Sequence, residues 1–162
     1  MAQVFISFLH EDEKVAVAVQ PMPQDKLATQ EVFLSADHWQ MFAGENWLDR
    51  IRAELIPAKI VILLLSAESV NRPWVNFAAG AAWLTDKPVL PVCFGGMRRD
   101  RLPKPYSRIQ ALDLRTDFYY LVASVAHHLR MSAPPPFWEG EDVRALMAAL
   151  DELEGVTGAA PA

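Results

Sequence analysis

Residues that could carry chemistry gather where apolar runs of strand length end. One such run, residues 4–8, contains Ser7, and another, residues 59–65, precedes a helical pattern that includes Trp74. Open parallel sheets bind ligands outside the carboxyl ends of their strands, which predicts a pocket there. Its candidate lining is a hydroxyl, a carboxylate and several apolar or aromatic side chains: Ser7, Phe8, Leu9, Asp37, Trp39, Phe42 and Trp74. For Trp39 and Phe42, core packing or a partner contact explains the sequence equally well, whereas pocket lining is the better interpretation of Trp74.

Other residue types that often carry chemistry have simpler explanations in this chain. The four histidines, His10, His38, His127 and His128, fit no metal-ligand spacing. The carboxylates at positions 11–13 suit the positive end of a helix better than a divalent cation. Cys93 has no second cysteine to pair with, so it is interpreted as a small core residue. The sequence therefore predicts no metal site.

The charge balance narrows the possible partners. The net charge is -5, from 15 basic and 20 acidic residues, which argues against nucleic-acid binding. The one dense basic cluster, Arg98, Arg99, Arg101 and Lys104, is interpreted as a solvated loop, with a local site for an anionic ligand as the alternative. No apolar run is long enough for a membrane span, and no secretory signal precedes residue 4. A cytoplasmic protein without a membrane contact is expected.

The elements that must position these residues alternate between strands and helices. Strands are predicted at residues 4–8, 31–35, 59–65, 88–94 and 109–114, and helices at residues 11–19, 47–55, 73–84 and 121–129. Pro21 and Pro23 are expected to end the first helix, and the two prolines at 88 and 91 indicate a strand near a sheet edge. This alternation predicts an α/β fold: a flavodoxin-like three-layer domain with a parallel sheet of about five strands.

The chain divides into one domain and a C-terminal segment. Residues 1–131 are predicted to form the domain. Residues 132–162 contain a proline-rich linker, an amphipathic helical pattern from Val143 to Leu153 and a flexible end.

The order and spacing of these motifs resemble the TIR domain family over about residues 3–131. The resemblance rests on the Val4-Phe5-Ile6-Ser7 strand, the acidic opening of the next helix, the Val32-Phe33-Leu34 strand that leads to a loop with Gly44, and a helix with Trp74 six residues before Gly80. In the family, the residues after the first strand, the loop after the second and the Trp helix line an NAD+ site. NAD+ is there the substrate, so the resemblance implies no cofactor. Phe8 and Leu9 stand where several relatives carry polar or basic residues.

The family signature for NAD+ cleavage is Trp-x-x-x-Glu, and this chain departs from it at the last position. The motif reads Trp74-Val75-Asn76-Phe77-Ala78. A carboxylate at that place would stabilise the oxocarbenium-like ribose as nicotinamide leaves, and loss of one such contact costs ~10²-fold or more in rate. Two explanations are open: a naturally inactive domain, or an active one disabled by substitution. The retention of Trp74 and Ser7 favours the second.

The resemblance implies a function and leaves a second one open. The first is an NAD+ nucleosidase that forms ADP-ribose or cyclic ADP-ribose as an antiphage immune effector, inactive here because of Ala78. Activation would need a homo-oligomer or filament, in which the loop around Gly44 completes the site of a neighbour, and a fused or partner sensor domain that binds a nucleotide signal. The alternative is a non-catalytic TIR adaptor that self-associates or binds other TIR domains. A secreted effector that interferes with host signalling is a third interpretation.

Overall fold

The computed structural model describes residues 3–27, 32–36, 43–44, 46–135 and 139–155. Its centre is a five-stranded sheet in the order β2-β1-β3-β4-β5, and every pair of neighbouring strands is parallel. The strands are β1 (Val4–Phe8), β2 (Val32–Ala36), β3 (Ile60–Leu65), β4 (Val89–Cys93) and β5 (Leu112–Asp113). All residues of β1, β3 and β4 are buried, as expected for strands covered on both faces. The predicted α/β fold with five parallel strands is confirmed.

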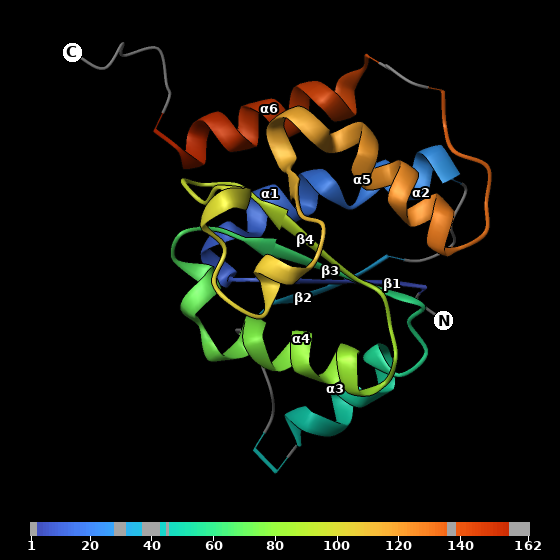
Figure 1. Ribbon diagram of the computed structural model, residues 1–162, viewed down its shortest axis with the longest axis vertical. Helices are drawn as coiled ribbons and strands as arrows, with labels where there is room; N and C mark the ends of the chain where they lie inside the picture. The colour runs from blue at the N-terminus through green and yellow to red at the C-terminus, as the bar shows by residue number, and fades with distance from the viewer. Residues whose placement is uncertain (1–2, 28–31, 37–42, 45, 136–138, 156–162) are drawn as a thin grey trace.

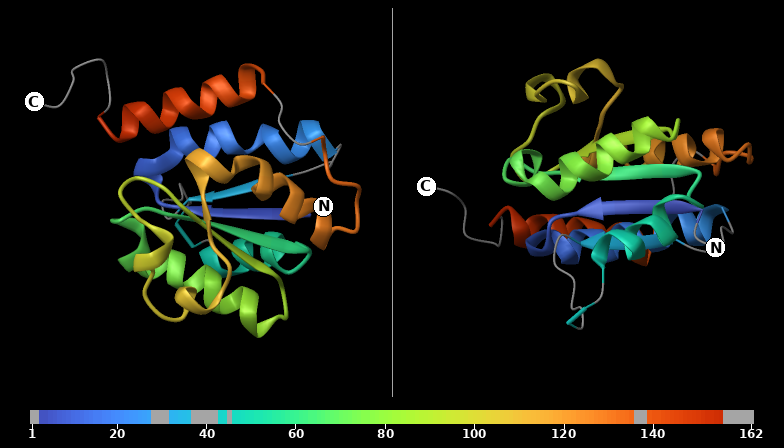
Figure 2. Two further views of the ribbon diagram at one scale, coloured as in Figure 1. Left: turned by 45° about the horizontal axis from the view of Figure 1, so that its top comes forward. Right: turned by 90° about the horizontal axis from the view of Figure 1, so that it is seen from below.

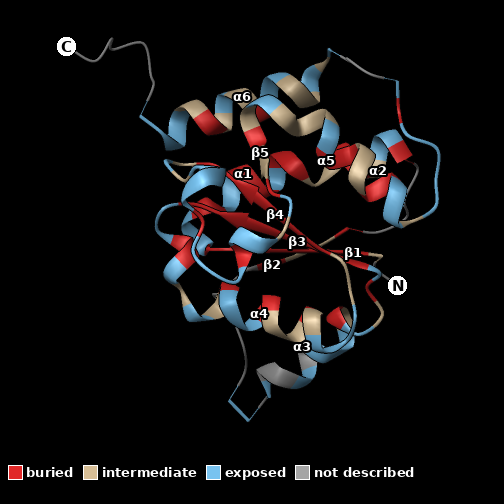
Figure 3. Cartoon of the chain, in the orientation of Figure 1, coloured by how far each residue is buried: buried red, intermediate tan, exposed pale blue. Residues whose placement is uncertain are grey.

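Helices cover both faces of the sheet and complete the three layers (Figure 1). One layer contains α1 (Glu13–Val19), α2 (Pro21–Leu27), α5 (Leu114–His128) and α6 (Glu141–Leu153), and the other contains α3 (Trp47–Leu55) and α4 (Pro73–Leu84). Because side chains alternate along a strand, Ile6 packs in the first core and Phe5 in the second. Figure 3 shows this distribution as buried strands between helices whose outer faces are exposed.

Pro21 and Pro23 follow the end of the first helix, as predicted, but they also belong to a second helix that was not predicted. Helix α1 ends at Val19, but Pro21 then begins α2, and Pro23 lies within the first turn of that helix. The first N–H groups of a helix have no intrahelical acceptor, so a proline there gives up no hydrogen bond. The prolines therefore separate two short helices, where the sequence predicted a single helix that they would end.

The fifth strand is shorter than predicted, and Pro91 explains part of the difference. β5 has two residues, and α5 begins directly at Leu114. Strand β4 lies between β3 and β5, yet β5 pairs only with Val92 and Cys93. Pro91 pairs with Leu63 of β3, but it lies outside the part of β4 that pairs with β5. The missing N–H of this proline therefore removes no hydrogen bond between β4 and β5.

The C-terminal segment packs against the domain. The predicted amphipathic helix is present as α6, and its Leu146 and Leu150 are fully buried in the same core as β1 and β3. Figure 2 shows α6 alongside α1, in agreement with the contacts between the two helices. Ion pairs join Lys14 to Glu152 and Arg115 to Asp151. None of the helices in the described ranges has the length and apolar character that a membrane crossing requires.

Candidate functional site

Two serines lie side by side near the carboxyl ends of the first two strands. The parallel register places Ser7 of β1 opposite Ser35 of β2, and both residues have 0% exposure. Phe5 and Phe33 precede them by two residues on the same strands, and their rings are 5.6 Å apart. Phe5 belongs to the core under α3 and α4, so strand alternation turns both serines toward that layer.

The hydroxyl groups of these two serines are unusual because they are buried without partners. Among the described residues, neither Ser7 Oγ nor Ser35 Oγ has a hydrogen-bond partner. Most buried polar side chains in folded proteins are hydrogen-bonded, and one left unpaired costs about 1–3 kcal/mol. The two unpaired hydroxyls therefore lower the stability of the folded domain, and such unfavourable features are common at binding sites.

Helix α4 brings the predicted motif to the same place. Pro73 begins the helix, and the indole Nε1 of Trp74 donates a hydrogen bond to the carbonyl oxygen of Ser35 at 3.4 Å. The half-buried indole also stacks on Phe77, with ring centroids 6.1 Å apart. Ala78 lies one turn later, is 1% exposed and packs in the core with Phe5. Ser7, Trp74 and Ala78 thus share one side of the sheet, and the space beside Ala78 is packed.

The remaining predicted site residues divide into two groups. Phe8 is 3% exposed and packs in the core on the opposite face of the sheet, so it does not join Ser7. Leu9 is fully buried directly after β1. Asp37, Trp39 and Phe42 lie outside the described residues. Ser35 was missed by the sequence analysis, although its place two residues after Phe33 in a predicted strand indicated the shared face.

A cavity of about 830 Å³ lies at the carboxyl ends of β3, β4 and β5, and Ser7, Phe8, Leu9 and Trp74 are not among its lining residues. Asp12, Ser66, Gly95 and Leu153 are among its lining residues. The Asp12 carboxylate is 5% exposed and accepts a hydrogen bond from Ser66 Oγ at 3.3 Å. Gly95 has a φ of 56°, and a Cβ there would lie 3.3 Å from that of Ser66. A pocket at the carboxyl ends of the strands was predicted, but these lining residues were not named, although the Gly-Gly pair at the end of the fourth predicted strand was a usable signal.

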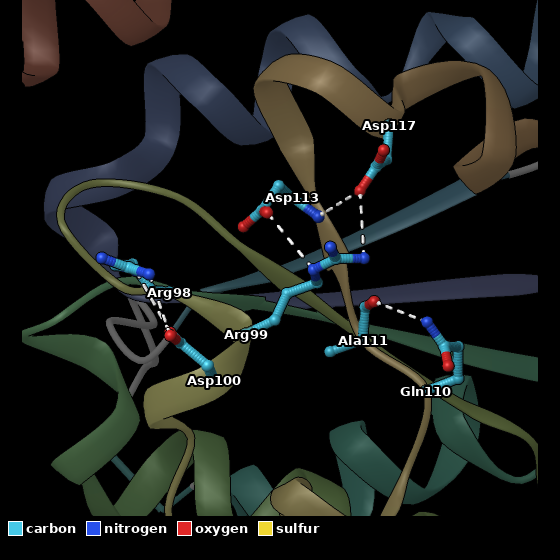
Figure 4. Close-up of polar contacts among 7 residues, drawn as sticks. All are labelled: Arg98, Arg99, Asp100, Gln110, Ala111, Asp113 and Asp117. Carbon is cyan, nitrogen blue, oxygen red and sulfur yellow. Dashed lines mark hydrogen bonds and ion pairs between the residues drawn. The ribbon is translucent and has the colours of Figure 1, made fainter.

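The basic cluster of the sequence is partly neutralised in the structure (Figure 4). Arg98 forms an ion pair with Asp100 at 2.9 Å. Arg99 lies 3.3 Å from Asp113 and 3.7 Å from Asp117. The interpretation of the cluster as a solvated loop is therefore incomplete, because Arg99 connects the loop after β4 to β5 and the first turn of α5.

Cys93 has the environment of a core residue. It is the C-terminal residue of β4 and is 1% exposed. Burial in a low-dielectric environment, with a further contribution from the negative charge of Asp113, raises the pKa of its thiol to about 12. At neutral pH the sulfur is therefore a thiol and a poor nucleophile.

Comparisons with known proteins agree with this fold. A family model described as "TIR domain" matches residues 4–129. Two structures of a metazoan TIR-STING receptor from C. gigas are similar: one at 18% identity, and one in complex with 2',3'-cGAMP at 21% identity, each with a TM-score of 0.52. The alignments cover 83% of this chain but only 41% and 40% of those chains. A comparison with curated proteins gives no significant match. Because the family model covers most of the sequence, the chain belongs to the TIR domain family.

Proposed function

We propose that this chain is a TIR domain of the NAD+-cleaving type that binds NAD+ but, with alanine at position 78, does not cleave it. The observation that carries the proposal is the pair of buried, unpartnered hydroxyls of Ser7 and Ser35 near Trp74, on the side of the sheet where Ala78 packs. Unpaired polar groups in a core are costly, and their persistence beside the motif favours a ligand site over ordinary packing.

The chemistry of glycosidic cleavage explains why this chain would bind NAD+ without cleaving it. Nicotinamide leaves NAD+ as a neutral group, and the ribose becomes an oxocarbenium-like cation that needs a nearby negative charge. Ala78 supplies neither a charge nor a hydrogen-bond acceptor. Trp74 still offers a flat aromatic surface for a ring of the dinucleotide. Binding would therefore persist without catalysis.

The biological setting is part of the same proposal. We place the domain in an antiphage effector that assembles into an oligomer or filament when a sensor domain binds a nucleotide. The similar solved structures support a sensor fusion, because they are TIR-STING receptors and one contains 2',3'-cGAMP. This chain spans about two fifths of the length of those chains.

A second candidate function is a TIR adaptor that only assembles. The observation in its favour is the combination of a packed environment around Ala78 and exposed apolar side chains on the same layer: Phe77 is 38%, Ile56 58% and Leu84 89% exposed. Exposed apolar side chains in one layer are candidates for a protein contact. An adaptor would use this surface and would have no need of NAD+.

Measurement of NAD+ binding distinguishes the two functions. We expect saturation-transfer NMR to detect NAD+ on the chain, and Trp74→Ala to weaken binding about tenfold, because an aromatic contact of this kind is worth about 1–2 kcal/mol. Tyr120→Ala is the control, since Tyr120 is 60% exposed on α5 in the other helix layer. If NAD+ does not bind, or if binding is unchanged by Trp74→Ala, the proposal fails and the adaptor function remains.

A further inference from the structure

We propose that Ser7 and Ser35 form a two-donor cradle for a carboxylate at position 78, which makes Ser35 a positioning residue of the cleavage site. The inference deepens the proposed function and rests on it. It explains why this chain keeps two buried hydroxyls that hydrogen-bond to nothing among the described residues.

The two hydroxyls lie on the side of the sheet whose core includes residues of α4. The indole N–H of Trp74 is a donor only, and it is already directed at the carbonyl of Ser35. Phe5, Leu63 and Ala78 contribute hydrocarbon to the same core. A serine hydroxyl can both donate and accept a hydrogen bond, and among the described residues neither hydroxyl does either. An ionised carboxylate, which only accepts hydrogen bonds, could take one O–H hydrogen bond from each of the two serines.

The register of the sheet and the helix places position 78 correctly for this role. Ser7 and Ser35 are neighbours across the β1–β2 ladder, and Trp74 Nε1 contacts the backbone of Ser35. Residues four apart on a helix share a face, so a side chain at 78 emerges beside the Trp74 indole. A longer side chain at position 78 would start on the side of the sheet that the two serines face, in a place where it would be buried.

Because position 78 is buried, an ionised carboxylate there would need the hydroxyls of Ser7 and Ser35 as hydrogen-bond donors. A carboxylate buried without partners is strongly unfavourable, whereas one that accepts two O–H hydrogen bonds makes short, charge-assisted contacts. The same contacts keep the carboxylate ionised and fix its orientation, which is the form that a developing ribosyl cation requires. The hydroxyls would therefore act on catalysis through the carboxylate and not by touching the substrate.

A double-mutant cycle on thermal stability tests the cradle independently of activity. The proteins are the chain, Ser35→Ala, Ala78→Glu and the double variant, with a parallel set for Ser7→Ala. In the chain, Ser35→Ala should leave the Tm unchanged or raise it, because it removes an unsatisfied hydroxyl. In the Ala78→Glu background it should lower the Tm by about 5 °C, because it removes a charge-assisted hydrogen bond. Ser124→Ala, on α5 in the opposite layer, should give the same shift in both backgrounds.

Activity and stability together separate the possible outcomes. If Ser35→Ala has the same effect on Tm in both backgrounds, the cradle does not exist, whatever the activity. If the coupling is present but Ala78→Glu releases no nicotinamide from NAD+, the cradle stands and the proposed function fails. Should Ala78→Glu not fold, the cycle is made with Ala78→Gln, whose amide oxygen accepts the same bonds, and lack of coupling there overturns the inference.

Discussion

Close packing of α4 favours a small residue at position 78, whereas NAD+ cleavage would need a carboxylate there. An alanine lets α4 lie close to the sheet, and Ala78 shares the inward face of the helix with Val75, Ala79 and Ala82. A glutamate would replace a methyl group in a packed core with a charge, at a cost of several kcal/mol if no partner were present. The serine hydroxyls beside it would offset much of that cost. A functional carboxylate here therefore depends on residues of two other elements, β1 and β2.

The reactivity of the Cys93 thiol tests whether the end of β4 is buried as the structure shows. We expect iodoacetamide at pH 8 to leave the thiol unmodified in the folded protein, because burial raises its pKa to about 12 and also blocks access. In denaturant the same thiol should react within minutes. Intact mass measured over time gives both rates. Equal modification rates in the folded and denatured protein would contradict the placement of Cys93 at the buried end of β4.

Helix α6 is expected to be a structural part of the domain. Leu150→Ala should lower the free energy of unfolding by about 2–4 kcal/mol, because it removes a fully buried side chain and leaves a cavity. The matched control is Leu84→Ala, at a position 89% exposed, which should change stability by less than about 0.5 kcal/mol. Urea unfolding monitored by circular dichroism measures both. A Leu150→Ala effect as small as the control would mean that α6 is only loosely attached.

Elements with a strong local pattern were predicted well. The continuous run of β-branched residues and leucines gave β3 within one residue, and Pro73 with its apolar helix gave both ends of α4. β5 was predicted too long, because the alternation of residues 109–114 is compatible with a strand and does not reveal that Leu114 begins a helix. The second helix after Pro21 was missed because a proline both ends one helix and suits the first turn of another.

The site was only partly predictable because its geometry is tertiary. Ser7 was identified from its position near a strand end, and Trp74 from a helical motif. The position of Ser7 opposite Ser35 depends on which strands are neighbours and on their register, and neither follows from local periodicity. The turn of Phe8 toward the opposite core follows from strand alternation and was available from the sequence.

The domain as a whole is expected to self-associate weakly through the α3–α4 layer. Leu84 and Ile56 expose large apolar surfaces there, which favours contact with a second copy over solvent. Light scattering over a wide concentration range should show a mass that rises with concentration. Leu84→Ser should reduce this rise, and Val17→Ser, at an exposed position on α1 in the other layer, should not. A mass that stays monomeric at every concentration, or equal behaviour of the two variants, would contradict this surface.

The proposed function is tested most directly by nicotinamide release from NAD+ by Ala78→Glu, compared with the unsubstituted chain at concentrations where the domain assembles. The restored carboxylate lies one turn from Trp74 and beside the Ser7 and Ser35 hydroxyls, so we expect a rate at least ~10²-fold above that of the chain. Adding Trp74→Ala should return the rate to the background level. Release by Ala78→Glu that is no faster than release by the chain itself, from a variant that is folded and assembled, would contradict the proposal.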